Sequence, residues 1–153
     1  MSGLPVVIAG EADDLQRAKL PANVVATGRV SDEDKEALLD LCRAFVFPSH
    51  LRSEAFGVAL LEAARSGKPM ISCEIGTGTT YVNVDGETGI VVPPQNPSRL
   101  AQAMQNLAGN AETAANFGRA AQERYKNLFT QEQMAAAYAD LYRQLAGRGA
   151  MRR

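Results

Sequence analysis

Two glutamates, Glu54 and Glu62, stand eight positions apart within the stretch from Arg52 to Pro69. Glu54 falls in a loop that follows an apolar segment, and Glu62 falls in the helix that this loop opens. Between them, Phe56 and Gly57 leave bare backbone at the helix N-terminus, which favours anionic groups. Carboxylates accept strong hydrogen bonds from ligand hydroxyls. A nucleotide-sugar carries both hydroxyls and phosphates, so this spacing indicates sugar-nucleotide chemistry.

Each glutamate also has a purely structural interpretation. Glu62 lies among apolar residues, so we expect it to be half-buried and in need of hydrogen-bond donors, which two ribose hydroxyls would supply. Equally, it is placed to pair with Arg65, three residues further along the helix. Glu54 either holds donor-sugar hydroxyls, or the positive charge that develops at the anomeric carbon, or else caps free backbone amides. The sequence leaves these alternatives open.

A second loop, Gly76–Thr80, offers exposed backbone amides and three hydroxyls. Such a loop can cradle a phosphate or a sugar, and it is just as often a simple turn. Its candidate binding residues are Gly76, Thr77, Gly78 and Thr79.

Two basic side chains add weaker candidates. His50, the single histidine, comes just after an apolar strand and is either a polar contact to the ligand or a solvated loop residue. Arg52 is a phosphate partner by charge, and a surface ion pair is the alternative.

The composition fits one compact domain, with 46% hydrophobic and 22% charged residues in 153. A formal charge of −1 argues against a general nucleic-acid binder. Cys42 and Cys73 have no zinc or redox spacing, so we expect buried free thiols and a cytoplasmic protein. Since no apolar run approaches the ~20 residues of a membrane span, any membrane contact would be peripheral.

Short apolar segments alternate with amphipathic helical ones. The sequence predicts strands over 6–10, 23–28, 44–48, 69–73 and 89–92, and helices over 13–20, from Ser31 to Cys42, over 58–66, around 100–107, over 111–126 and from Met134 to Leu145. This order is typical of an α/β fold, a parallel sheet with helices on both faces. Because ligands bind beyond the carboxyl ends of such strands, Glu54 and the Gly76–Thr80 loop belong to one edge.

The last third is predicted to be helical, and Met134, Tyr138, Leu141 and Leu145 lie on one face of its final helix. We expect a single domain over residues 1–146 and a disordered tail over 147–153, because Gly147-Arg148-Gly149 should end that helix.

A set of motifs comes in a fixed order: Pro48-Ser49, Ser53–Gly57, Leu60–Ala63, Gly67–Pro69 and Asp85–Pro94. With these motifs the chain, from Val6 to about Leu145, resembles the C-terminal, nucleotide-sugar-binding domain of family 4 retaining glycosyltransferases. These group 1 enzymes have two Rossmann-like domains, the GT-B fold.

The resemblance implies roles for individual residues. Glu54 would act as the catalytic-site residue that contacts the donor sugar, Glu62 would bind the ribose, and the backbone around Phe56, Gly57 and Val58 would approach sugar and phosphate. Family members transfer a hexose from a nucleotide-sugar, here a GDP- or UDP-sugar, with retention. They need no metal or other cofactor, because basic side chains and a helix N-terminus stabilise the leaving diphosphate.

Two departures from the family pattern matter. The Gly76–Asn83 stretch lacks the acid that many members carry, which resembles a mannosyltransferase-like subset of O-antigen and exopolysaccharide assembly. The acceptor-binding first domain is missing, and so are the strand and loop that grip the diphosphate. We therefore expect a domain that is incomplete at its N-terminal edge, inactive alone and prone to self-associate through its last helix.

The leading hypothesis is the donor-binding domain of a glycosyltransferase for a cell-surface polysaccharide such as lipopolysaccharide. It would act at the cytoplasmic membrane face on a lipid-linked or polysaccharide acceptor. One alternative is a non-catalytic nucleotide-binding or interaction module of the same fold. Another is a two-domain epimerase or phosphorylase. The glutamate spacing argues against both of these enzymes, and no lysine suggests the pyridoxal site of a phosphorylase.

Overall fold

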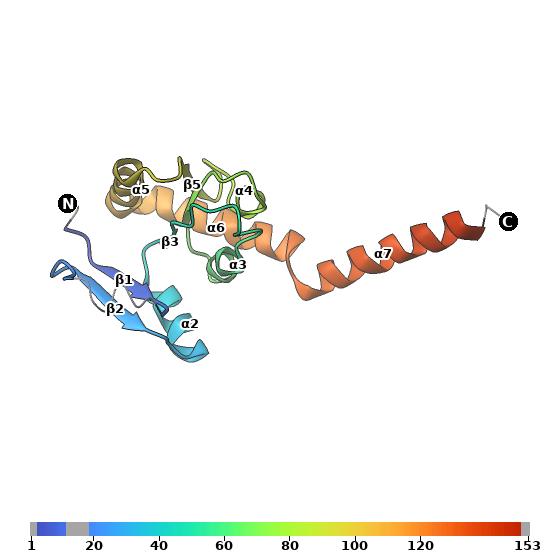
Figure 1. Ribbon diagram of the computed structural model, residues 1–153, viewed down its shortest axis with the longest axis horizontal. Coiled ribbons are helices and arrows are strands. Elements are labelled where there is room, and N and C mark those ends of the chain that lie inside the picture. Colours follow the sequence, from blue (N-terminus) through green and yellow to red (C-terminus); the bar gives the residue numbers. More distant parts are fainter. Residues whose placement is uncertain (1–2, 12–18, 151–153) are drawn as a thin grey trace.

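The computed structural model describes residues 3–11 and 19–150. Its strands are β1 (Val6–Ala9), β2 (Val24–Gly28), β3 (Phe45–Phe47), β4 (Met70–Cys73) and β5 (Gly89–Val92). Its helices are α2 (Asp32–Leu41), α3 (Val58–Arg65), α4 (Thr79–Val82), α5 (Pro97–Gly109), α6 (Ala111–Leu128) and α7 (Gln131–Ala150). Most of the helix expected over 13–20 falls on residues 13–18, which lie outside the described part. Figure 1 shows a compact body from which α7 projects as an arm.

All strand pairs are parallel, as the alternation of strands and helices predicts, but they form two sheets rather than one. One sheet has the order β1-β2, the other β3-β4-β5. In Figure 1 the β1-β2 pair lies to one side of the body that contains the other three strands. The doubly wound order is 3-2-1-4-5-6. The β2-β1 pair and the β3-β4-β5 run each fit a segment of that order, and among the described residues no strand pairing joins the two sheets.

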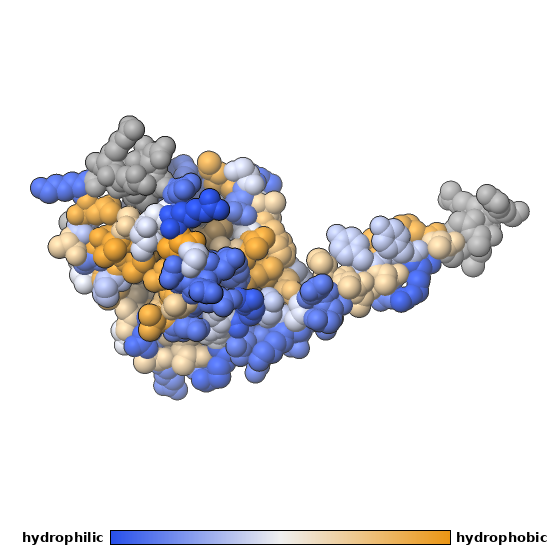
Figure 2. Space-filling model, turned by 90° about the horizontal axis from the view of Figure 1, so that it is seen from below, coloured by the Kyte–Doolittle hydropathy of each residue, from blue (hydrophilic) through white to orange (hydrophobic). Residues whose placement is uncertain are grey.

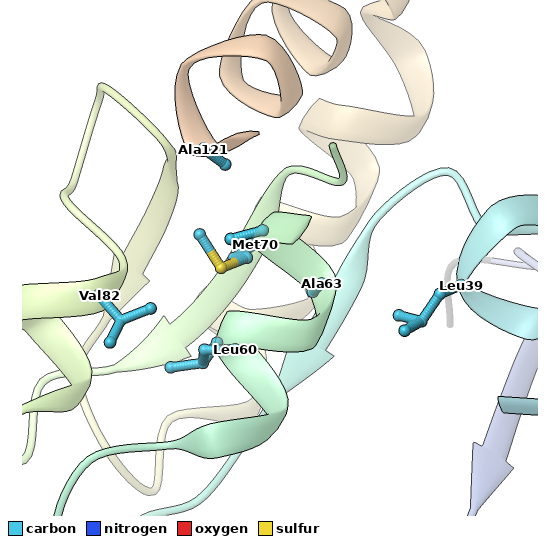
Figure 3. Packing of buried hydrophobic residues seen from close by; sticks show 7 residues of the cluster. Leu39, Leu60, Ala63, Met70, Val82 and Ala121 are labelled. Atoms are coloured by element: carbon cyan, nitrogen blue, oxygen red, sulfur yellow. The ribbon is translucent and has the colours of Figure 1, made fainter. Parts of the chain in front are cut away.

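Strand β4 is the centre of the larger sheet, because it pairs with β3 through Met70–Ser72 and with β5 along its whole length. All four of its residues are buried, as expected of a parallel strand covered on both faces. Met70 faces one core cluster and Ile71 the other. Figure 3 shows the first cluster, with Leu60 of α3, Val82 of α4 and Ala121 of α6 around Met70. Two helical layers therefore hold the sheet rigid beneath its carboxyl edge.

Helix α2 begins as the sequence predicts. The Ser31 hydroxyl accepts a hydrogen bond from the Asp34 N–H at 3.0 Å, and three acids follow in the first turn. Its leucines differ in burial: Leu41 is 85% exposed, whereas Leu39 is buried and points toward Ala63 of α3 in Figure 3. Helix α2 therefore joins the body through its contact with α3.

The C-terminal helices start at two asparagine caps, since the side chains of Asn96 and Asn110 accept bonds from backbone amides three residues on. Helix α6 crosses close to the α3–β4 turn: a Cβ on Gly118 would lie 2.2 Å from the Gly67 carbonyl oxygen. The expected helix end at Gly147 is too early, because α7 continues to Ala150. A single glycine weakens a helix without terminating it.

Helix α7 carries exposed apolar residues. These are Met134, Tyr138, Leu141, Tyr142 and Leu145, all at least half exposed. Figure 2 shows this helix standing apart from the body, with apolar and polar residues on its free surface. The described chain therefore leaves an amphipathic stripe uncovered.

Candidate functional site

The loop after β3 is organised around Glu54. Its Oε1 accepts a hydrogen bond from the Gly57 N–H at 2.9 Å, so the capping role that the sequence allowed for this carboxylate is present. Gly57 is the N-cap of α3, has φ 83° and makes no side-chain cap. That conformation favours glycine. The first amides of α3 are therefore left without a side-chain cap, which suits an anionic group.

In the loop after β4, polar groups of the loop contact one another. Glu74 Oε1 accepts from the Gly76 N–H at 2.9 Å, and the Thr77 and Thr79 hydroxyls lie 3.3 Å apart. Thr79 is only 1% exposed and begins the short helix α4. The sequence interpretation missed this helix and took the whole segment for a loop. Thr77 and Gly78 stay partly exposed at its start.

The two loops touch each other. The Gly78 N–H donates to the Ala55 carbonyl at 2.8 Å. A Cβ on Gly78 would lie 2.6 Å from Phe56 Cδ2, and a Cβ on Gly57 would lie 3.4 Å from Thr79 Cγ2. The expectation that both loops share the carboxyl edge of the sheet is confirmed by this contact.

Arg52 extends across the same junction. Its Nη1 would lie 3.1 Å from a Cβ on Gly76, so its guanidinium lies against the second loop, although the side chain is exposed. His50 is exposed and forms no hydrogen bond with the described residues. Val58 is 67% exposed on the first turn of α3. The structure therefore places Arg52 and Val58 beside the two loops, while a ligand contact by His50 stays a prediction.

Glu62 is half-buried, as its apolar surroundings predict, with 32% of its side chain exposed. Its partner is Lys35 of α2, at 2.8 Å from Nζ to Oε1, and the same ammonium contacts Asp32 at 3.0 Å. The alternative pairing with Arg65 is wrong, because Arg65 contacts Glu36 at 2.7 Å instead. Packing α2 against α3 brings opposite charges together across the helix pair, and sequence spacing within one helix could not reveal this.

The position of Glu62 also affects the chemistry of Lys35. The hydrogen bond from Lys35 to Glu62 raises the pKa of Lys35 above its ordinary value, and the hydrogen bond to Asp32 raises it further. The ammonium therefore stays charged at neutral pH, and it loses its proton as the pH rises through this raised pKa. Glu62 Oε2 accepts no hydrogen bond from the described residues. One oxygen of Glu62 is thus held by Lys35, and the other has no hydrogen-bond partner among the described residues.

A buried polar network that local sequence patterns do not predict supports the second loop. Asn83 is fully buried; its amide donates to Ser72 Oγ at 2.8 Å, and its carbonyl accepts from Thr88 Oγ1 at 3.0 Å. Residues 86–88 form a turn before β5, and Asp85 Oδ1 accepts a hydrogen bond from the Val91 N–H at 2.8 Å. The turn, β4 and β5 are therefore joined below α4.

An open cavity of about 550 Å³ lies next to this network. Its lining combines polar and apolar groups: Glu74, Thr80, Asn83, Val84, Asp85, Val91, Val92, Pro93 and Pro94. It adjoins the second loop through Glu74 and Thr80. The cavity extends the accessible carboxyl edge of the sheet past β4.

Other features of the described residues bear on the kind of site. No group of three or more His, Cys, Asp or Glu residues among them is arranged to hold a metal ion. Cys42 and Cys73 are free, and burial raises the pKa of both thiols. Within the described part of the chain, no helix has the length and apolar character needed to cross a membrane.

Known proteins share both the sequence and the fold. The sequence pattern of the family described as "Glycosyl transferases group 1" matches residues 2–124. O-antigen chain mannosyltransferase C of Escherichia coli is 49% identical over 147 residues, 92% of this chain and 40% of that protein. D-rhamnosyltransferase WbpZ of Pseudomonas aeruginosa is 58% identical over 134 residues, 82% of this chain and 35% of that protein.

Among solved structures, a sucrose-phosphate synthase from Thermosynechococcus elongatus superposes with a TM-score of 0.80 at 26% identity, covering 94% of this chain and 39% of that one. The fold is therefore that of a GT-B glycosyltransferase domain. The chain spans between a third and two-fifths of the length of the two curated relatives above.

Proposed function

The chain belongs to the group 1 glycosyl transferases, and from this premise we propose that it is the donor-binding domain of a retaining hexosyltransferase. The observation that carries the proposal is the contact between the two loops at the carboxyl edge. The Gly78 N–H donates to the Ala55 carbonyl, and Glu54 accepts from Gly57 beside the uncapped start of α3. Hydroxyl-binding carboxylates thus border a position suited to phosphate.

The proposed roles follow from these contacts. The diphosphate lies at the first turn of α3, beside Gly57, where the Val58 amide has no side-chain cap and Arg52 adds positive charge. Glu62 binds ribose hydroxyls through Oε2, because Lys35 already occupies Oε1. Glu54 contacts the donor sugar through the oxygen that Gly57 does not occupy.

Charge stabilisation of the leaving diphosphate is the chemistry that this arrangement supports. Oriented amides at a helix start, together with a guanidinium, stabilise charge as the sugar–phosphate bond breaks. In the second loop, the partly exposed Thr77 is the group best placed to contact the same ligand, because the Gly76 and Gly78 N–H groups already bond Glu74 and Ala55 and Thr79 is buried. We propose that donor binding requires no metal ion; titration in the presence of EDTA should give the same affinity as titration without it, whereas a loss would reveal a metal requirement.

For the substrates, the proposal draws on the names of the two relatives. One is a mannosyltransferase of the O-antigen chain and the other a D-rhamnosyltransferase. We propose a GDP- or UDP-hexose donor, with mannose as the first sugar to test, and an acceptor that is lipid-linked or a growing cell-surface polysaccharide. Such an acceptor places the enzyme in the cytoplasm, at the inner face of the cell membrane.

We further propose that the active enzyme contains a preceding acceptor-binding domain and one more strand. That strand would lie between β1 and β3 and join the two sheets in the doubly wound order. The exposed α7 stripe would pack on the first domain. In the isolated chain, the same stripe should cause self-association, which sedimentation at increasing concentration measures; Tyr138→Glu should abolish it if the stripe is responsible.

The direct test compares two glutamate variants by calorimetric titration with a nucleoside diphosphate and the matching nucleotide-sugar. Glu62→Ala should weaken binding of both ligands, because both contain the ribose. Glu54→Ala should weaken binding of the nucleotide-sugar more than that of the bare diphosphate. Glu87→Ala, at an exposed turn, is the matched control and should bind like the unmodified chain.

The outcomes of these titrations distinguish the roles of Glu54 and Glu62. Unchanged affinity in Glu62→Ala removes its ribose contact. Equal losses for both ligands in Glu54→Ala place that carboxylate on the phosphate or in the loop scaffold. Binding of nucleotide by the chain, with no transfer even when the chain is part of a two-domain enzyme, would favour a non-catalytic module.

A further inference from the structure

An aromatic cluster connects the junction of α6 and α7 to both site loops. The Phe129 ring makes edge-to-face contacts with Phe56, at 6.1 Å between centroids, and with Tyr81, at 5.6 Å. Phe56 belongs to the loop after β3, Tyr81 to α4, and Phe129 is the C-cap of α6. One side chain therefore touches both elements that border the proposed donor position.

Arg124 holds this cluster in place. Its guanidinium lies 5.1 Å from the Tyr81 ring centroid and 5.8 Å from that of Phe129. It also donates two hydrogen bonds to the Tyr81 carbonyl, from Nε at 3.2 Å and from Nη2 at 2.7 Å. A planar fork with two bonds to one oxygen, stacked beside two rings, fixes α6 relative to α4.

The Phe56 residue is 36% exposed, and its ring has contacts on two sides. On one side is the Gly78 backbone, where an added Cβ would lie 2.6 Å from Phe56 Cδ2, and on another is the edge of Phe129. Phe56 directly precedes Gly57, whose left-handed conformation opens α3. A shift of Phe129 would therefore be transmitted to the backbone that we propose contacts the phosphate.

We propose that Phe129, held by Arg124, is a positioning residue for the Phe56–Gly57 loop. It thereby couples donor binding to the direction in which α7 leaves the domain. Phe129 lies two residues before Gln131, where α7 begins. A partner that grips the exposed stripe of α7 would act on this same ring. The effect of Phe129 on donor binding rests on the proposed donor site, whereas its positioning of the Phe56–Gly57 loop does not.

The first test needs no ligand. Amide hydrogen exchange, followed by NMR on the 153-residue chain, reports the Gly57 and Gly78 N–H groups, which bond Glu54 and Ala55. Phe129→Ala should accelerate exchange at both amides about tenfold relative to the rest of the core. Phe129→Tyr, which keeps the ring, should restore the unmodified rates.

The matched control is Phe117→Ala, another partly buried phenylalanine of α6 that packs against the other core cluster. It should lower stability without selective exchange at Gly57 and Gly78. Unchanged rates in Phe129→Ala, or the same pattern in both variants, would overturn the proposal.

The second test titrates the same variants with GDP-mannose and UDP-glucose. Phe129→Ala should bind about tenfold more weakly, and Phe117→Ala should bind like the unmodified chain at a temperature where both are folded. If the unmodified chain binds neither donor, the proposed donor site is contradicted. The exchange experiment would still decide whether Phe129 positions the Phe56–Gly57 loop. Binding by Phe129→Ala at full affinity, despite accelerated exchange, would overturn the part that concerns the donor.

Discussion

Replacing Gly78 with alanine tests the contact between the two loops with one methyl group. Gly78 has φ −64°, which any residue adopts, so the substitution introduces no backbone strain. The added Cβ would lie 2.6 Å from Phe56 Cδ2 and 2.9 Å from the Ala55 oxygen. Both separations are shorter than van der Waals contact, and the second involves backbone. The loops must therefore move apart.

The expected loss follows from overpacking, which costs about 1–3 kcal/mol in a well-packed region. For a chain of this size, that corresponds to a fall in Tm of about 3–10 °C. Gly109→Ala is the matched control: Gly109 ends α5, nothing lies within 4 Å of its added Cβ, and helix propensity favours alanine. Gly109→Ala should leave Tm unchanged or raise it slightly.

Thermal unfolding and nucleotide titration on the two variants give the comparison. Gly78→Ala should lose both stability and affinity. Adding Phe56→Ala should recover part of the stability, because the ring contact is gone. It should not restore affinity, because the Ala55 carbonyl is still displaced. A Gly78→Ala protein with the Tm and affinity of the unmodified chain would refute the close approach of the loops.

Three further results are expected. Lys35→Met should weaken nucleotide binding, measured by calorimetry, by less than Glu62→Ala does, because it removes the ion pair that holds Glu62. Lys68→Met is the control and should leave the affinity unchanged. Full affinity in Lys35→Met would show that Glu62 does not need the ion pair with Lys35. Asn83→Ala should lower the free energy of unfolding by about 1–3 kcal/mol, since two buried hydroxyls lose a partner; a urea midpoint equal to that of the unmodified chain would contradict the network. Because burial raises the pKa of the Cys73 thiol, iodoacetamide at pH 8 should modify it more slowly in the folded chain than in urea, as mass spectrometry can measure; equal rates would contradict its burial.

Local patterns predicted most elements well. The run Gly89–Val92 is strand β5 residue for residue, and α6 begins at Ala111 as expected. These segments have strong periodicity and clear start signals, such as the Asn110 cap. Helix α4 was missed because four residues that include two threonines have no helical period and low helix propensity. Its formation depends on Asn83 and Gly78, whose partners lie on other elements.

The candidate site was predictable where it depends on strand order and unpredictable where it depends on helix crossings. Parallel strands put the loops after β3 and β4 on one edge, so their contact could be anticipated. The Lys35–Glu62 pair and the Arg124–Tyr81 contact join residues that are 27 and 43 positions apart, on surfaces whose packing no local pattern specifies. The separation of the strands into two sheets could not be predicted either, because it depends on which strands pair and not on any local pattern.

The most direct measurement is NMR mapping of the chain during titration with GDP-mannose and UDP-glucose. We predict saturable shifts that appear first at the amides of Gly57, Val58 and Gly76–Thr79, with one base preferred, and that disappear in Glu62→Ala. Shifts confined to β1 and β2 or to α7, or no saturable shift with either donor, would contradict the claim that these two loops form a donor site.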